Sequence, residues 1–217
     1  LAPKGICGSG ILDLIAEGFL SGWIDSAGNL QKSASPCIRD VWDDTRQRNV
    51  PAIIYAYDGN VPLYFTQDDI GEFLTCKAAA HTMVATLLES VNVSPSEIGA
   101  FYLAGGFGTH YDLESAITVG LYPDLPREKF KILGNSSLAG AKRLLLDTGC
   151  RARLDQIRAL ATYVQFGEME KFVENMQAAR FLPHTDASRY PSVMRRLRER
   201  GKVSPPGKLA AERSGAD

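Results

Sequence analysis

The residues best suited to chemistry form a short apolar run that ends in glycines. Residues 101–108 read Phe-Tyr-Leu-Ala-Gly-Gly-Phe-Gly, and Asp112 marks the start of a helix soon afterwards. Glycines at the carboxyl end of a buried strand let the main chain adopt positive φ, and they let a flat or anionic group approach without meeting a Cβ. The same glycines also fit an ordinary tight strand-to-helix turn. The pattern favours a nucleotide cleft with one wall formed by Ala104, Gly105, Gly106, Phe107 and Gly108.

A second glycine-rich segment, Gly8-Ser9-Gly10, leads into apolar residues that repeat at helical spacing until Gly22. The free N–H groups and the positive dipole end of such a helix favour an anion, and the two glycines would let a phosphate come close. The alternative is that Ser9 is only an N-cap and that the glycines only form a turn.

Lys77 and His81 lie four residues apart on the apolar stripe of a long helix that Thr66 and Asp69 are expected to cap. A charged group on such a stripe indicates a polar cleft beside it. We therefore expect Lys77 either to face a site or to extend its ammonium past the margin of the stripe. For His81 the preferred interpretation is a hydrogen-bonded core histidine.

The remaining elements predict an α/β fold with a mixed sheet flanked by helices. Strands are expected at 52–57 and 61–65, joined by a hairpin turn, and again at 101–104 and 129–133, with helices between and after them. Ligands bind at the carboxyl ends of parallel strands, so Gly105 and Asn135 should lie at the same edge. Helices within 151–180 are expected to cover a face of the same domain.

Composition limits the function classes. The chain has 217 residues, is 45% hydrophobic and carries a formal net charge of -1, so it can bury a core and has no overall attraction to nucleic acid or an anionic membrane. No apolar run approaches the roughly 20 residues that span a bilayer. Four widely spaced cysteines are expected to be reduced thiols of a cytoplasmic protein rather than metal ligands. Because the first residue is Leu1, we expect a piece of a longer polypeptide.

Four segments together resemble a known family. They are residues 6–13 (Ile-Cys-Gly-Ser-Gly-Ile-Leu-Asp), 69–79, 103–108 and 134–141 (Gly-Asn-Ser-Ser-Leu-Ala-Gly-Ala). The set is similar to the C-terminal ATPase region of the reductive activators of corrinoid-dependent enzymes. That region belongs to the ASKHA superfamily, with the sugar and acetate kinases, heat-shock chaperones and actin. The resemblance implies a ribonuclease-H-like, actin-like ATPase fold with extra C-terminal helices.

The resemblance also implies a domain division and a set of binding residues. Residues 1–190 would form the C-terminal half of the ATPase domain. The arginine run after Pro191 and the composition beyond Gly201 separately predict a basic helix and a disordered tail over 191–217. Gly105, Gly106 and Gly108 would hold the adenosine of ATP, and Lys77 would reach the ribose. Asn135 would face the same cleft, with Gly8, Ser9 and Gly10 near the phosphates.

In this family, ATP binding and hydrolysis help to return the corrinoid of a methyltransferase system from Co(II) to Co(I). The partner is therefore expected to be a corrinoid protein, with a homodimer as a further arrangement. The electron comes from an N-terminal 2Fe-2S domain, whose close cysteine spacing this chain lacks. Also missing are the acidic loops Asp-x-Gly-Thr and Asp-x-Gly-Gly, which position Mg²⁺. We expect the chain to be part of a larger activator and to hydrolyse ATP poorly alone.

Two other functions remain open. The chain could be a non-catalytic module of the same fold that docks a partner or dimerises. It could also belong to the activators of radical dehydratases, which carry a cluster cysteine in a glycine loop. Cys7 is the candidate for that cysteine, although we expect it to pack at the helix entrance.

Overall fold

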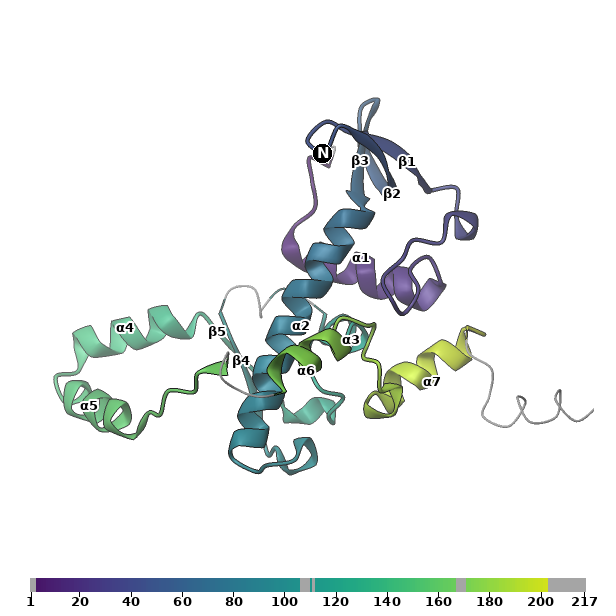
Figure 1. Cartoon of the computed structure of the whole chain (residues 1–217). Coiled ribbons are helices and arrows are strands. Elements are labelled where there is room, and N and C mark those ends of the chain that lie inside the picture. The colour runs from purple at the N-terminus through teal and green to yellow at the C-terminus, as the bar shows by residue number, and fades with distance from the viewer. Residues whose placement is uncertain (1–2, 106–109, 111, 167–170, 203–217) are drawn as a thin grey trace, which may run out of the picture.

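The structure is a computed structural model that describes residues 3–105, 110, 112–166 and 171–202. The helices are α1 (Gly8–Ser21), α2 (Gln67–Ser90), α3 (Leu113–Thr118), α4 (Ser136–Leu146), α5 (Cys150–Leu160), α6 (Phe172–Ala178) and α7 (Pro191–Glu199). The strands are β1 (Ile38–Asp43), β2 (Arg48–Asp58), β3 (Val61–Thr66), β4 (Phe101–Ala104) and β5 (Phe130–Gly134). Figure 1 shows α2 as the long central helix, with β1, β2 and β3 near the end at which it begins.

The alternation of strands and helices confirms the predicted α/β fold. The described strands lie in two sheets: β1, β2 and β3 form an antiparallel sheet in that order, and β4 pairs with β5 in parallel. Gly59 supplies the turn between β2 and β3 with a φ of 60°. Strand β1 was not predicted, because only Ile38 and Asp43 of its six residues are buried and its exposed positions are mostly polar.

Helix α2 begins where its sequence predicts. The hydroxyl of Thr66 accepts from the N–H of Asp69 at 3.1 Å, and the Asp69 carboxylate accepts from the N–H of Thr66 at 2.9 Å. This capping box satisfies two main-chain donors that the helix leaves unpaired. The buried side of α2 then carries apolar residues together with Lys77 and His81.

One hydrophobic core joins α1, both sheets, α2, α3 and the C-terminal segment. It includes Ile15 of α1, Ile70 of α2 and Ile117 of α3, all fully buried. Val193 and Leu197 of α7 belong to the same core. The basic helix therefore packs on the body through one face, while the expected division at residue 190 stays a prediction.

The pair α4 and α5 departs from expectation. Neither helix contains a buried residue, and Ile157 is 58% exposed. The prediction that the helices of 151–180 cover a face of the domain is therefore wrong for α5. Figure 1 shows this helical hairpin extending away from the body, whereas α6 lies against α2. No helix in the described part of the chain is both long and apolar enough to cross a bilayer.

Candidate functional site

The two glycine-ending strands bring two predicted site segments together. Gly105 follows β4 with a φ of 101°, and its N–H donates to the carbonyl of Gly134 at 2.7 Å. Gly134 ends β5 with a φ of 65°. Asn135 comes next and caps α4, since its side-chain oxygen accepts from the N–H of Leu138 at 3.0 Å. Gly105 and Asn135 therefore lie at one edge of the parallel pair.

Within the described part of the chain, the edge at Gly105 is open. Apart from the two chain neighbours of Gly105, no described atom would lie within 4 Å of a Cβ built on this glycine, and the preceding residue, Ala104, is exposed. A main chain at positive φ with free space above it can accept a flat group at close range. Gly106, Phe107 and Gly108 lie outside the described residues, so the rest of this predicted wall stays a prediction.

The first turn of α1 contains Gly8, Ser9 and Gly10, as expected, but its N-cap is Cys7. The alternative that Ser9 is the N-cap is therefore wrong. Cys7 makes no side-chain capping bond to the main chain. A Cβ on Gly10 would lie 2.8 Å from Cγ1 of Ile6, so packing inside the protein already explains this glycine.

Cys7 itself is exposed, which overturns the expectation that it packs at the helix entrance. Its sulfur lies 3.0 Å from the Ser9 hydroxyl. That hydrogen bond, followed by one from the N–H of Gly10, lowers the pKa of the thiol. Thiolate formation at a helix N-terminus is favoured for the same electrostatic reason as anion binding.

Lys77 is 2% exposed and lies deep in the protein. Its ammonium donates to the carbonyls of Ala179 at 2.5 Å, Phe181 at 2.7 Å and Pro183 at 2.7 Å. An ammonium has three protons, so all of them are used by this one chain segment. Burial lowers the pKa of Lys77 to about 7, while the three carbonyl oxygens favour its charged form. A contact with a ribose would require one of these bonds to be exchanged.

His81 lies one turn further along α2 and is 7% exposed. Its Nδ1 is 3.3 Å from the hydroxyl of the buried Tyr190, which confirms the interpretation as a hydrogen-bonded core histidine. The ring of His184 packs against it with centroids 5.4 Å apart. Burial, and then the positive charge of Lys77, lower the pKa of His81 to about 3. Sequence reasoning missed this cluster because Lys77 and His81 are more than 100 residues away from His184 and Tyr190 along the chain.

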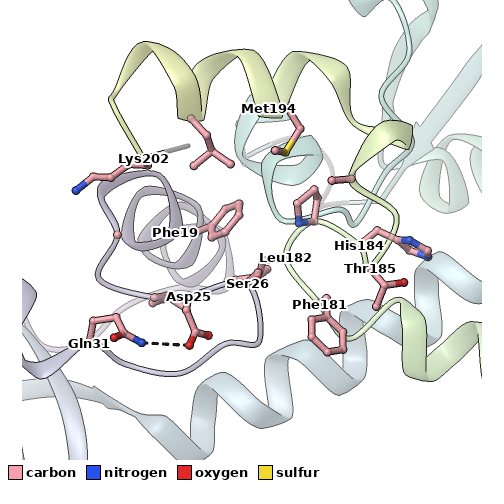
Figure 2. A pocket seen from close by; sticks show the side chains of 15 residues that line it. Phe19, Asp25, Ser26, Gln31, Phe181, Leu182, His184, Thr185, Met194 and Lys202 are labelled. Atoms are coloured by element: carbon pink, nitrogen blue, oxygen red, sulfur yellow. Dashed lines mark hydrogen bonds between the residues drawn. The ribbon is translucent and has the colours of Figure 1, made fainter. Parts of the chain in front are cut away.

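A cavity of about 590 Å³ lies beside the segment that Lys77 holds. Figure 2 shows Phe19, Phe181 and Met194 among its walls, and Gln31 donating to Asp25 at 3.1 Å on one side. None of the predicted site residues that the structure describes lines it. No sequence motif could have indicated this cavity, because its lining is drawn from α1, the loop after it, residues 181–187 and α7.

Three comparisons bear on this geometry. The family described as the C-terminal domain of RACo, the ASKHA domain, matches residues 1–194. The corrinoid activation enzyme RamQ of Eubacterium limosum is 30% identical over 179 residues, which cover 80% of this chain and 30% of that protein. A solved structure described as a reductive activator for corrinoid, iron-sulfur protein is similar with a TM-score of 0.80 and 34% identity.

That structural match covers 89% of this chain and 31% of the other, so the chain spans less than a third of either relative. The matched region contains the parallel strand pair with its open glycine edge and the core around α2. The chain belongs to the family of RACo C-terminal ASKHA domains.

Proposed function

We propose that this chain is the nucleotide-binding portion of an ATP-dependent reductive activator, which returns a corrinoid protein from Co(II) to Co(I). The observation that carries the proposal is the open edge at Gly105, in a chain whose relatives are described as a corrinoid activation enzyme and a reductive activator. A positive-φ glycine at the end of a parallel strand is suited to a nucleotide wall.

In this proposal the main chain at Ala104 and Gly105 lies against the adenosine, with Gly106, Phe107 and Gly108 continuing that wall. Asn135 caps α4 at the same edge, where its side-chain oxygen accepts from the N–H of Leu138. The N–H groups of Gly8, Ser9 and Gly10, in the first turn of α1, are donors suited to phosphate oxygens, which would compete with the Cys7 sulfur for the N–H groups of Ser9 and Gly10. When bound, ATP supplies the free energy that an uphill electron transfer needs.

Lys77 takes a different role in the proposal from the ribose contact that the resemblance implies. Its three carbonyl bonds join α2 to the segment 179–183. Helix α2 also packs against β2 and β3. Lys77 is thus a positioning residue that fixes the C-terminal segment on the central helix.

In this proposal the metal ligands of the activator belong to residues outside this sequence. Among the described residues no group of three or more histidine, cysteine or acidic side chains is placed to hold a metal ion. We therefore place the Mg²⁺ ligands and the 2Fe-2S cluster elsewhere in the activator, and we propose a corrinoid protein of a cytoplasmic methyltransferase system as the partner. No step of phosphoryl transfer is assigned to residues of this chain.

A reconstituted system tests the proposal. It contains the activator polypeptide that carries this sequence, an electron donor, ATP and the corrinoid protein in its Co(II) state. The account expects the Co(I) absorption spectrum to develop with ATP and not with ADP. Equal rates of Co(I) formation with and without ATP would refute the ATP-dependent function.

A further inference from the structure

The α4–α5 hairpin exposes an unusual amount of apolar surface. Leu145 is 86% exposed, Leu146 77% and Leu160 83%. Each helix has 11 residues, which is shorter than an isolated helix needs to be stable in water. Helices of this length are usually stabilised by packing an apolar face against another surface. We therefore expect the exposed apolar side chains of the hairpin to contact another protein surface.

Leu145 also lines a groove between the two helices. The groove has a volume of about 580 Å³. Its lining consists of apolar residues with two charged side chains, namely Ala141, Leu144, Leu145, Arg151, Leu154 and Asp155. A concave apolar groove accepts side chains or a helix from another protein. A membrane surface would instead favour one flat apolar face.

The hairpin is also a local concentration of positive charge. Residues 136–160 contain two acidic side chains and five basic ones, although the whole chain has a net charge of -1. The five basic residues are Lys142, Arg143, Arg151, Arg153 and Arg158. Of these, within the described part of the chain, only Arg158 has a carboxylate oxygen within 4.0 Å, at 3.9 Å from Asp155.

Charge selects among the possible occupants of the groove. A second copy of the chain would bring the same positive charge against itself, which opposes symmetric pairing of two hairpins. A partner with acidic residues around an apolar centre would match both the groove and its basic surroundings.

We propose that the α4–α5 hairpin is the docking surface for an acidic patch with an apolar centre on the corrinoid protein. The proposal rests on the proposed function, because that function supplies the corrinoid protein as the partner. The groove contacts the apolar centre, and the surrounding arginines contact the acidic rim.

Biolayer interferometry tests the docking surface. The activator polypeptide is immobilised, and the organism's corrinoid protein in its Co(II) state is the analyte. The variant Arg151→Glu/Arg153→Glu should raise Kd about 10-fold and weaken its salt dependence. The matched control Arg195→Glu/Arg198→Glu makes the same charge change on exposed positions of α7 and should change Kd less than about 2-fold.

A second pair of variants tests the apolar part. Leu145→Ser should weaken binding, whereas Val61→Ser, at a position 63% exposed on β3, should not. Neither residue is buried, so circular dichroism should show both variants folded.

The possible outcomes separate the two proposals. If wild type binds and both hairpin variants bind equally well, the docking surface is wrong and the proposed function stands. If wild type does not bind the corrinoid protein in any nucleotide state, the proposed partner fails and the docking surface fails with it. Loss of self-association in Leu145→Ser, with unchanged corrinoid-protein binding, would assign the hairpin to a dimer. Hairpin-dependent sedimentation with anionic phospholipid vesicles, again with unchanged binding, would assign it to a membrane surface.

Discussion

Replacing Lys77 with methionine tests the role that the structure gives this buried ammonium. Methionine has a similar length and no donor, so the change removes three hydrogen bonds without opening a large cavity. The carbonyls of Ala179, Phe181 and Pro183 would then lose their Lys77 partner, two of them in fully buried bonds.

The magnitude follows from two opposing effects. A hydrogen bond to a charged group contributes about 1.5–3 kcal/mol, which gives roughly 5 kcal/mol or more for three of them. Part of this stability loss is offset because the substitution also removes a charge that burial destabilises. Burial lowers the pKa of Lys77 to about 7 for the same reason. We expect a net loss of about 3 kcal/mol, equivalent to a fall in Tm of roughly 6–12 °C for a domain of this size.

Urea denaturation of wild type, Lys77→Met and Lys129→Met measures the effect. Lys129 is the matched control, since it donates to one exposed carbonyl, that of Ser96, at 3.2 Å. Its replacement should change the free energy of unfolding by no more than about 0.5 kcal/mol. Hydrogen exchange should also show faster exchange in residues 179–183 of Lys77→Met alone. Equal stability of Lys77→Met and Lys129→Met would refute the reasoning.

Three further predictions concern packing, pH and ion pairing. Gly120→Ala should destabilise the protein by more than about 3 kcal/mol in urea denaturation, because its φ is 77° and its Cβ would lie 2.0 Å from the carbonyl oxygen of Pro183. The control Gly59→Ala has a φ of 60° and open space, and it should lose about 1 kcal/mol; similar losses for both would contradict the close contact. In the folded protein the pKa of His81 is lowered to about 3, so His81 binds a proton more tightly in the unfolded chain. The free energy of unfolding should therefore fall as pH drops from 6.5 towards 3, by up to about 1.4 kcal/mol per pH unit. Denaturation at pH 7, 6 and 5 should show a flatter profile in His81→Phe, and an unchanged profile would exclude this histidine as the cause. Arg127→Met should lose about 2 kcal/mol through its ion pairs with two carboxylates at 2.5 and 2.8 Å, and a calorimetric Tm equal to that of wild type would count against those pairs.

Local signals predicted much of the fold. Thr66 and Asp69 form the expected capping box, Gly22 ends α1 at positive φ, and Gly105 and Asn135 share the expected edge. Each of these features depends on a few neighbouring residues, whose conformational preferences are strong enough to act alone.

The features that the sequence did not predict depend on contacts with distant parts of the chain. Lys77 shows only that a charge lies on an apolar stripe, and its partners are more than 100 residues away. The exposure of α5 could not be predicted either, because Leu154 and Ile157 repeat as they would in a packed helix. Periodicity indicates which face of a helix is apolar and leaves open what covers that face.

Isothermal titration calorimetry with ATP and Mg²⁺ tests the central claim, that the open edge at Gly105 is a nucleotide wall. Wild type should bind one ATP, and Gly105→Val should weaken that binding about 10-fold or more by placing a branched side chain in the open space. Gly59→Val makes a similar change at another open, positive-φ glycine and should leave ATP affinity unchanged. No heat of binding with wild type, or equal affinity of the two variants, would contradict the claim.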